Sequence, residues 1–227
     1  MVIRKSGLLY KSFYILQKDL HQEFRTRYAI NAIFLFAITT LVVVSFSIGA
    51  AELSQNILSS LLWIIIFFSA MTGLSHVFVR EEEQQTADTL KLVAPPVAIY
   101  LGKLLFNILL LLGLELILIP LYVVFMDMSV GNLPVFILMI VLGSTGVSAV
   151  ATIMAAIISR TSAKGALFAV LSFPVMLPVL ILSIQGTALA IQGSSISAGT
   201  DEIQMLLLFI IVIVTASILL FEFVWIL

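Results

Sequence analysis

The sequence predicts an all-α integral membrane protein with six transmembrane helices. Of its 227 residues, 62% are hydrophobic and only 10% are charged, whereas about a quarter of a soluble globular protein is charged. Six apolar runs each approach the roughly 20 residues that a helix needs to cross the hydrocarbon core. Runs this long and continuous are typical of helices, because barrel strands are shorter and alternate in polarity. The six runs are residues 28–51, 57–79, 104–126, 133–158, 166–191 and 203–227.

The segment before the first span, residues 1–27, is predicted to contain a cytoplasmic amphipathic helix over residues 8–27. Its apolar residues recur at steps of three and four and therefore share one face; they are Leu9, Phe13, Leu16, Leu20 and Phe24. We expect this helix to lie in the membrane interface, with its basic residues near anionic lipid headgroups. Packing on a partner is the alternative. No short apolar core with a cleavage site is present, so we expect the first span to be retained as an anchor.

The distribution of charge predicts the orientation of the spans. Six of the eleven Lys and Arg residues precede the first span, three lie between spans two and three, and Arg160 and Lys164 lie between spans four and five. The other connections contain only acidic charges, namely Glu52, Asp127, Asp201 and Glu202. By the positive-inside rule, both termini are cytoplasmic. The last apolar run continues to Leu227, so we expect no soluble domain after it.

The longest polar interruption, residues 80–103, is predicted to be a cytoplasmic coupling segment. Ala87, Leu90 and Ala94 recur at helical spacing, acidic residues favour a helix N-terminus, and Pro95 and Pro96 end the helix. We expect this short helix to sit in a groove of a soluble subunit and to pass motion to the spans. A loop that merely stays out of lipid is the alternative. The residues expected to make the coupling contacts are Glu81, Glu82, Glu83, Asp88 and Leu90.

Three residues inside the spans are candidates for a translocation or hinge role. Glu115 lies at the centre of the third span, where a charged carboxylate is costly, so we expect it to be protonated or hydrogen-bonded to other helices. Its candidate partners are Ser144, Thr145 and Ser148. It serves either packing or translocation. Pro174 and Pro178 bend the fifth span, either as a joint or as a static kink.

Small residues around Gly143 and Gly146 predict a packing surface on the fourth span, either inside the bundle or between two copies of the chain. The absence of cysteine and the presence of only two histidines argue against a resident metal centre. His21 and His76 could ligate haem in principle, although isolated histidines are mostly structural. Gly102-Lys103 lacks the earlier glycine of a phosphate-binding loop. We therefore expect a chain that is not an enzyme, binds no nucleic acid, and takes its energy from another polypeptide.

Three stretches resemble the haem exporter protein B family, CcmB, of cytochrome c maturation. The first runs from Phe78-Val79-Arg80-Glu81 through Thr89-Leu90-Lys91-Leu92 to Pro95 and Leu101-Gly102-Lys103. The second is Pro174-Val175-Met176-Leu177-Pro178-Val179-Leu180-Ile181, and the third is Lys18-Asp19-Leu20 with Glu23-Phe24-Arg25-Thr26-Arg27. The chain departs from the family pattern at Asp88, where a glycine usually precedes Thr-Leu, and at Leu182-Ser183, where the family tends to have Phe-Gly.

The resemblance implies a type-2 ABC permease in the cell inner membrane. It implies a homodimer that pairs with a cytoplasmic ABC ATPase and a haem-handling membrane protein, and that delivers or releases haem on the external side. The chain has no tryptophan-rich external haem motif, so we expect haem to be a handled ligand and not a bound cofactor. Two alternatives stay open: a type-2 permease for a lipid, drug or glycan, and a non-transporting membrane scaffold coupled to an ATPase.

Overall fold

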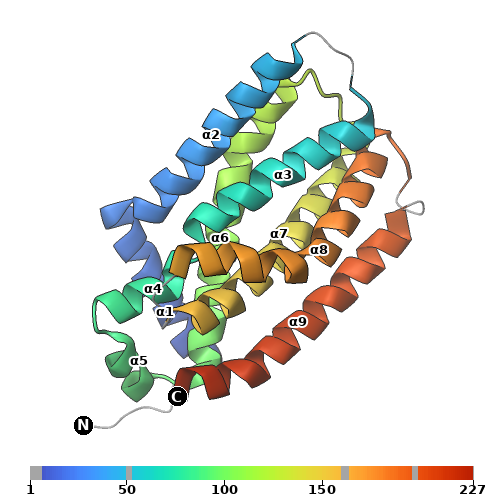
Figure 1. Ribbon diagram of the computed structural model, residues 1–227. Helices are drawn as coiled ribbons and strands as arrows, with labels where there is room; N and C mark the ends of the chain where they lie inside the picture. Colours follow the sequence, from blue (N-terminus) through green and yellow to red (C-terminus); the bar gives the residue numbers. More distant parts are fainter. Residues whose placement is uncertain (1–6, 50–52, 160–163, 196–198, 227) are drawn as a thin grey trace.

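The computed structural model describes residues 7–49, 53–159, 164–195 and 199–226, and these residues form a helical bundle without strands (Figure 1). Six helices are long and apolar enough to cross a membrane, which confirms the predicted architecture. Glu52 and Arg160 lie outside the described residues. The helices are α1 (Leu8–Thr26), α2 (Tyr28–Ile48), α3 (Gln55–Gly73), α4 (His76–Glu83), α5 (Ala87–Val93), α6 (Pro96–Phe125), α7 (Leu133–Ile158), α8 (Lys164–Ile191) and α9 (Thr200–Ile226).

The two ends of the bundle differ in charge. The helices α1, α4 and α5, the start of α6 and the end of α9 lie together at the lower end of Figure 1, whereas α2, α6 and α8 end at the opposite side. The lower end therefore carries the basic residues of α1, α4, α5 and α6. Asp127, Asp201 and Glu202 lie at the other end. This separation is the one that the sequence predicts.

The second span is interrupted near its polar end. Helix α3 ends at Gly73, a turn follows at Leu74 and Ser75, and α4 continues to Glu83. A Cβ atom at Gly73 would lie 2.2 Å from the side chain of Ile33, so glycine lets α2 and α3 cross closely here. The acidic residues 81–83 consequently end α4. The prediction that they begin the next helix is wrong, and only Asp88 lies in the first turn of α5.

The coupling segment is shorter than predicted, because both flanking spans extend into it. Helix α5 ends at Val93 and α6 begins at Pro96, a proline position that suits the first turn of a helix. The third span thus begins before the predicted Leu104 and includes Lys103. The connection between α4 and α6 comprises residues 84–95, with α5 as its only helix among the described residues.

Helix α7 lies at the centre of the bundle and is buried along most of its length. A Cβ atom at Gly143 would lie 2.2 Å from the Trp63 ring of α3 and 2.4 Å from Ser183 Oγ of α8. Gly146 in turn lies against Val179 of α8. The predicted small-residue surface therefore packs inside the bundle, where it lets α3 and α8 approach α7.

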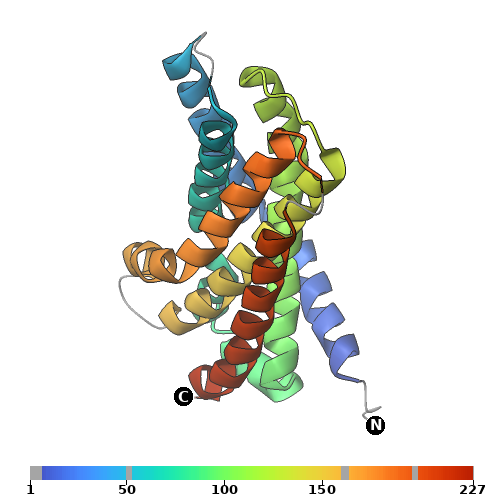
Figure 2. The same ribbon diagram turned by 90° about the vertical axis from the view of Figure 1, so that its right-hand side faces the viewer.

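Helix α8 contains Pro174 and Pro178 in its interior and is bent in that region. Figure 2 shows its N-terminal part turning away from the direction of its C-terminal part. Each proline removes a backbone hydrogen bond and crowds the preceding turn, which explains the bend. The predicted bend is present, and its use as a hinge stays a prediction.

Candidate functional site

The corner between α1 and α2 fixes the position of the N-terminal helix. Arg27, the residue between the two helices, adopts a left-handed backbone conformation with φ of 54°. The Glu23 carboxylate accepts a hydrogen bond of 3.0 Å from the backbone N–H of Ile30. This bond satisfies one of the free N–H groups in the first turn of α2. The corner therefore holds α1 across the end of α6, the helix on which it packs.

The face of α1 that packs on the bundle is not the predicted apolar stripe. Leu9, Phe13 and Phe24 are more than half exposed, whereas Leu16 is buried. A Cβ atom at Gly102 would lie 2.8 Å from the backbone oxygen of Ser12, so glycine permits this close contact between α1 and α6. The residues of the predicted stripe are thus divided, with Leu16 on the packed face and Leu9, Phe13 and Phe24 facing outward. The packed face comprises Ser12, Ile15, Leu16, Asp19 and Glu23.

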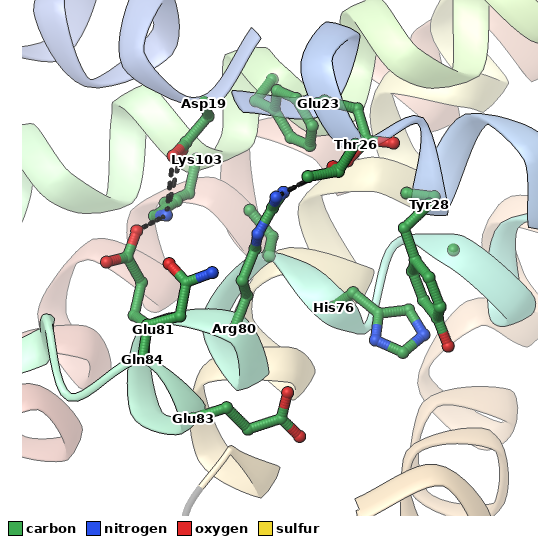
Figure 3. Close-up of a pocket in the computed structure, with 14 residues that line it drawn as sticks. Asp19, Glu23, Thr26, Tyr28, His76, Arg80, Glu81, Glu83, Gln84 and Lys103 are labelled. Atoms are coloured by element: carbon green, nitrogen blue, oxygen red, sulfur yellow. Dashed lines mark hydrogen bonds and ion pairs between the residues drawn. The ribbon is translucent and has the colours of Figure 1, made fainter. Parts of the chain in front are cut away.

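Lys103 is the centre of a buried group of charges at this end of the bundle (Figure 3). Its side chain is 1% exposed. The ammonium Nζ donates hydrogen bonds to Asp19 Oδ1 of α1 at 3.1 Å and to Glu81 Oε1 of α4 at 2.6 Å. A buried lysine is stable only when carboxylates compensate its charge. Lys103 therefore ties α1, α4 and α6 together.

Lys18 adds a second cation to the same carboxylates. Its ammonium donates a hydrogen bond to Glu81 and lies 3.2 Å from Asp19 Oδ1. Partial burial alone would lower the pKa of Lys18, but Asp19 and Glu81 outweigh it and raise the pKa above its ordinary value. Thr86 completes the group by donating a 2.6 Å hydrogen bond to Glu81 Oε2. The ammonium of Lys18 therefore stays charged.

Arg80 forms a second link between α4 and α1. Its Nη1 donates to Glu23 Oε2 at 3.3 Å and its Nη2 donates to Thr26 Oγ1 at 2.9 Å (Figure 3). The cations and the carboxylates of these contacts are equal in number, so their charges balance. We call them the charge cluster; its members are Lys18, Asp19, Glu23, Arg80, Glu81 and Lys103.

A pocket of about 400 Å³ lies beside the charge cluster and is lined by residues of α1, α2, α3, α4 and α6. His76 stands at its edge, with its ring edge-on to that of Tyr28 at a centroid distance of 4.8 Å (Figure 3). His21 is exposed on α1. The described residues contain no group of three or more side chains that could hold a metal ion. The geometry gives His76 an aromatic packing partner.

Helix α5 presents apolar side chains away from the bundle. Leu92 is 89% exposed and Val93 is 66% exposed. The helix is nevertheless held from two sides: Lys11 of α1 donates a 3.1 Å hydrogen bond to the carbonyl oxygen of Val93, and Lys91 lies 5.9 Å from the ring centroid of Trp225 in α9. These two contacts connect α5 to α1 and to α9.

A family model describing the CcmB protein family matches residues 10–225, which is nearly the whole chain. The chain belongs to the CcmB family. No curated protein sequence matches it significantly, so the family match and the structure carry the assignment. As a CcmB protein it is a multi-pass membrane subunit of a haem exporter ABC system for cytochrome c maturation.

The structure places the predicted coupling residues of this CcmB protein in different environments. Glu83 and Asp88 are exposed, and Glu82 is half-buried. Glu81 is buried in the charge cluster, and Leu90 is partly buried against the core. Glu81 therefore has an internal structural role in place of the expected contact with a soluble partner, because Lys103 and Lys18 donate hydrogen bonds to its carboxylate. A coupling role for the other residues stays a prediction.

Sequence reasoning missed two parts of this site. Leu92 and Val93 are the exposed apolar residues of α5, and Asp19 and Lys103 are the buried charges where α1, α4 and α6 meet. A usable signal was present on α1, where Ile15, Asp19 and Glu23 recur at steps of four and so share a face. Carboxylates that alternate with a buried apolar residue on one helical face indicate a packed face that meets cations.

The predicted mid-membrane carboxylate is buried between α6 and α7. Glu115 is 2% exposed, and Ser144 Oγ donates a hydrogen bond to its Oε1. Ser144 was one of the candidate partners, so the prediction of an interhelical hydrogen bond is confirmed. Its use in translocation stays a prediction.

Proposed function

We propose that this chain is the membrane half of an ABC transporter that uses ATP hydrolysed by a separate cytoplasmic subunit. The observation that carries the proposal is α5, a short helix that exposes Leu92 and Val93 while Lys11 and Lys91 hold it against α1 and α9. Exposed apolar side chains on a fixed helix outside the spans suit a groove in a soluble protein. The side chain of Asp88 is 92% exposed, so its carboxylate can pair with a basic residue at the edge of that groove.

Helix α1 is the element through which motion of α5 reaches the spans. Lys11 and Gln22 of α1 contact Val93 and Gln84, near the two ends of the connection that contains α5. Lys18 contacts Glu81 in α4, just before that connection. The adjoining face of α1, with Ser12 and Ile15, packs on α6 at Gly102. A displacement of α5 is thus passed to α1 and then to α6, in addition to the covalent link through Pro95.

The remaining parts of the proposal follow from the family and from the charge distribution. The basic end of the bundle faces the cytoplasm, as the positive-inside rule requires, and the protein resides in the inner membrane. Two copies of the chain pair with two ATPase subunits and with a haem-handling membrane protein. In this proposal haem is delivered or released on the external side and is not ligated by this chain.

Co-purification of the chain with its ATPase subunit tests the proposal. Leu92→Asp places a carboxylate in the apolar contact, and we expect it to lower the recovered ATPase at least about tenfold, since losing one apolar anchor costs roughly 1.5–3 kcal/mol. Leu92→Met keeps the apolar contact and should retain the partner. Both variants should elute from size exclusion like the wild type, because this side chain contacts the bundle little. Full recovery of the ATPase with Leu92→Asp would contradict docking through α5.

A further inference from the structure

A row of polar side chains crosses the middle of the bundle between α6 and α7. Glu115 accepts from Ser144 at one end of the row, and Asn107 Nδ2 donates to Thr152 Oγ1 at 2.9 Å at the other. All of its members are 2% exposed or less. We call it the polar seam; it comprises Asn107, Glu115, Ser144, Ser148 and Thr152.

The polar seam contains oxygen atoms for which the protein supplies no partner. The two interhelical hydrogen bonds are eight residues apart on each helix, so the antiparallel register puts Ser148 opposite Leu111. Ser148 Oγ, Glu115 Oε2 and Asn107 Oδ1 have no hydrogen bond within the described chain. A buried polar atom without a partner costs on the order of 1–3 kcal/mol. Three such atoms along one seam indicate that small hydrogen-bonding molecules lie beside them.

The seam lies on the same face of α6 as Lys103 of the charge cluster. On α6, Lys103, Asn107, Leu111 and Glu115 follow at steps of four and therefore line one face of the helix, and each is buried. Lys103 and Asn107 are one helical turn apart along α6. Three of these four buried residues are polar, and at the level of the fourth, Leu111, Ser148 of α7 supplies a polar atom.

The helices that pack on α6 bring no charge to the level of Glu115. Helices α2, α3 and α7 contain no Asp, Glu, Lys or Arg. The charges of α1 belong to the charged end of the bundle, Asp201 and Glu202 lie at the opposite end, and Glu222 of α9 is exposed. With no cation at its level among the described residues, Glu115 is compensated by a proton or by water.

We propose that the polar seam binds water and that this water is the path by which Glu115 gains and loses a proton. A hydronium ion beside Oε2 transfers its proton to the carboxylate, which leaves water and a carboxylic acid, and the reverse step returns the proton. Ser148 Oγ, which can donate and accept, holds the water between Glu115 and Asn107. The proton enters from the end that carries Lys103.

Infrared spectroscopy of the full chain in lipid nanodiscs tests this proposal. The carbonyl stretch of a protonated Glu115 is identified as the band that Glu115→Gln removes. After transfer to D2O, we expect this band to shift as the acid proton exchanges. Ser148→Ala removes the central oxygen without breaking a side-chain hydrogen bond, and it should slow exchange by roughly tenfold, the factor that corresponds to about 1.4 kcal/mol.

Ser183→Ala is the matched control, because Ser183 is also fully buried with an unpartnered Oγ but belongs to α8. It should leave the exchange rate at the wild-type value. Three results would overturn the proposal: the absence of a carboxylic acid band, which would mean an ionised Glu115; a wild-type band that fails to exchange while the fold persists; or exchange in Ser148→Ala as fast as in the wild type.

Discussion

Helix α6 carries two buried polar regions that handle charge in opposite ways. In the charge cluster, Lys103 is surrounded by ionised carboxylates from α1 and α4, and every charge has an opposite charge within 3.3 Å. In the polar seam, three turns further along, Glu115 accepts a hydrogen bond from the Ser144 hydroxyl and faces no charged group among the described residues. The same helix thus uses ion pairs near its end and neutral hydrogen bonds near its middle.

The difference follows from the cost of charge at different depths. Near the end of a span, solvent and long side chains reduce the desolvation cost, so a paired lysine is tolerated. At mid-bilayer an ion costs several kcal/mol, and neutral groups replace it. The balanced charges of the cluster join three helices in one fixed geometry. The polar atoms of the seam that have no hydrogen-bond partner in the described chain can instead bind a small ligand. Removing charge should therefore harm the first region far more than the second.

The largest effect is expected from Lys103→Met. The substitution keeps an unbranched side chain that is one atom shorter, and it leaves Asp19 and Glu81 with Lys18 as their only cation in the described contacts. Removing one partner of a buried ion pair typically costs about 3–5 kcal/mol, and we expect a loss of that size in thermal or denaturant unfolding of the purified chain. Lys91→Met is the control, because its partner Asp88 is almost fully exposed. Equal stability of the two variants would contradict a structural role for the cluster.

The same conservative substitution made in both regions compares them directly. Glu81→Gln removes an anion that accepts from Lys18, Lys103 and Thr86, and it should cost roughly 2 kcal/mol or more. Glu115→Gln keeps an oxygen that can accept from Ser144, and it should change stability by less than about 1 kcal/mol. Unfolding in the same detergent measures both. A collapse of Glu115→Gln would show that the seam needs an ionised carboxylate.

A smaller effect is expected from two alanine substitutions on α6. A Cβ atom at Gly102 would lie 2.8 Å from Ile15 and from the Ser12 backbone, so Gly102→Ala should push α1 away and cost about 1–3 kcal/mol. At Gly113 nothing lies within 4 Å of the added atom. Gly113→Ala should therefore gain up to about 1 kcal/mol from its higher helix propensity. Thermal unfolding of both variants measures these changes in stability. A higher stability of Gly102→Ala would mean that α1 is not docked closely on α6.

The spans could be predicted well because their signal is local. Long apolar runs determine the six helices, and a carboxylate in the middle of such a run requires a polar neighbour, which is why Ser144 could be anticipated for Glu115. Pro174 and Pro178 likewise bend α8 through their own covalent geometry. The resemblance to the CcmB family also rested on short local stretches.

The charge cluster could not be predicted in the same way, because its partners are distant in the sequence. Lys103 meets Asp19 across 84 residues and Glu81 across 22. Local patterning placed Glu81 and Lys103 together in a polar segment and therefore assigned both to solvent. The pattern could not show that α4 and α6 extend into that segment and bury both residues.

The sequence by itself determined that this is a six-span helical membrane protein whose charges are separated between the two ends of the bundle, since hydropathy and charge distribution are properties of the chain alone. Only the tertiary structure decided which charges are buried and which side chains of α1 and α5 face outward. The physical reason is that ion pairing depends on the docking of α1 against α4 and α6. Those contacts turned α1 so that its acidic face, and not its whole apolar stripe, lies against the bundle.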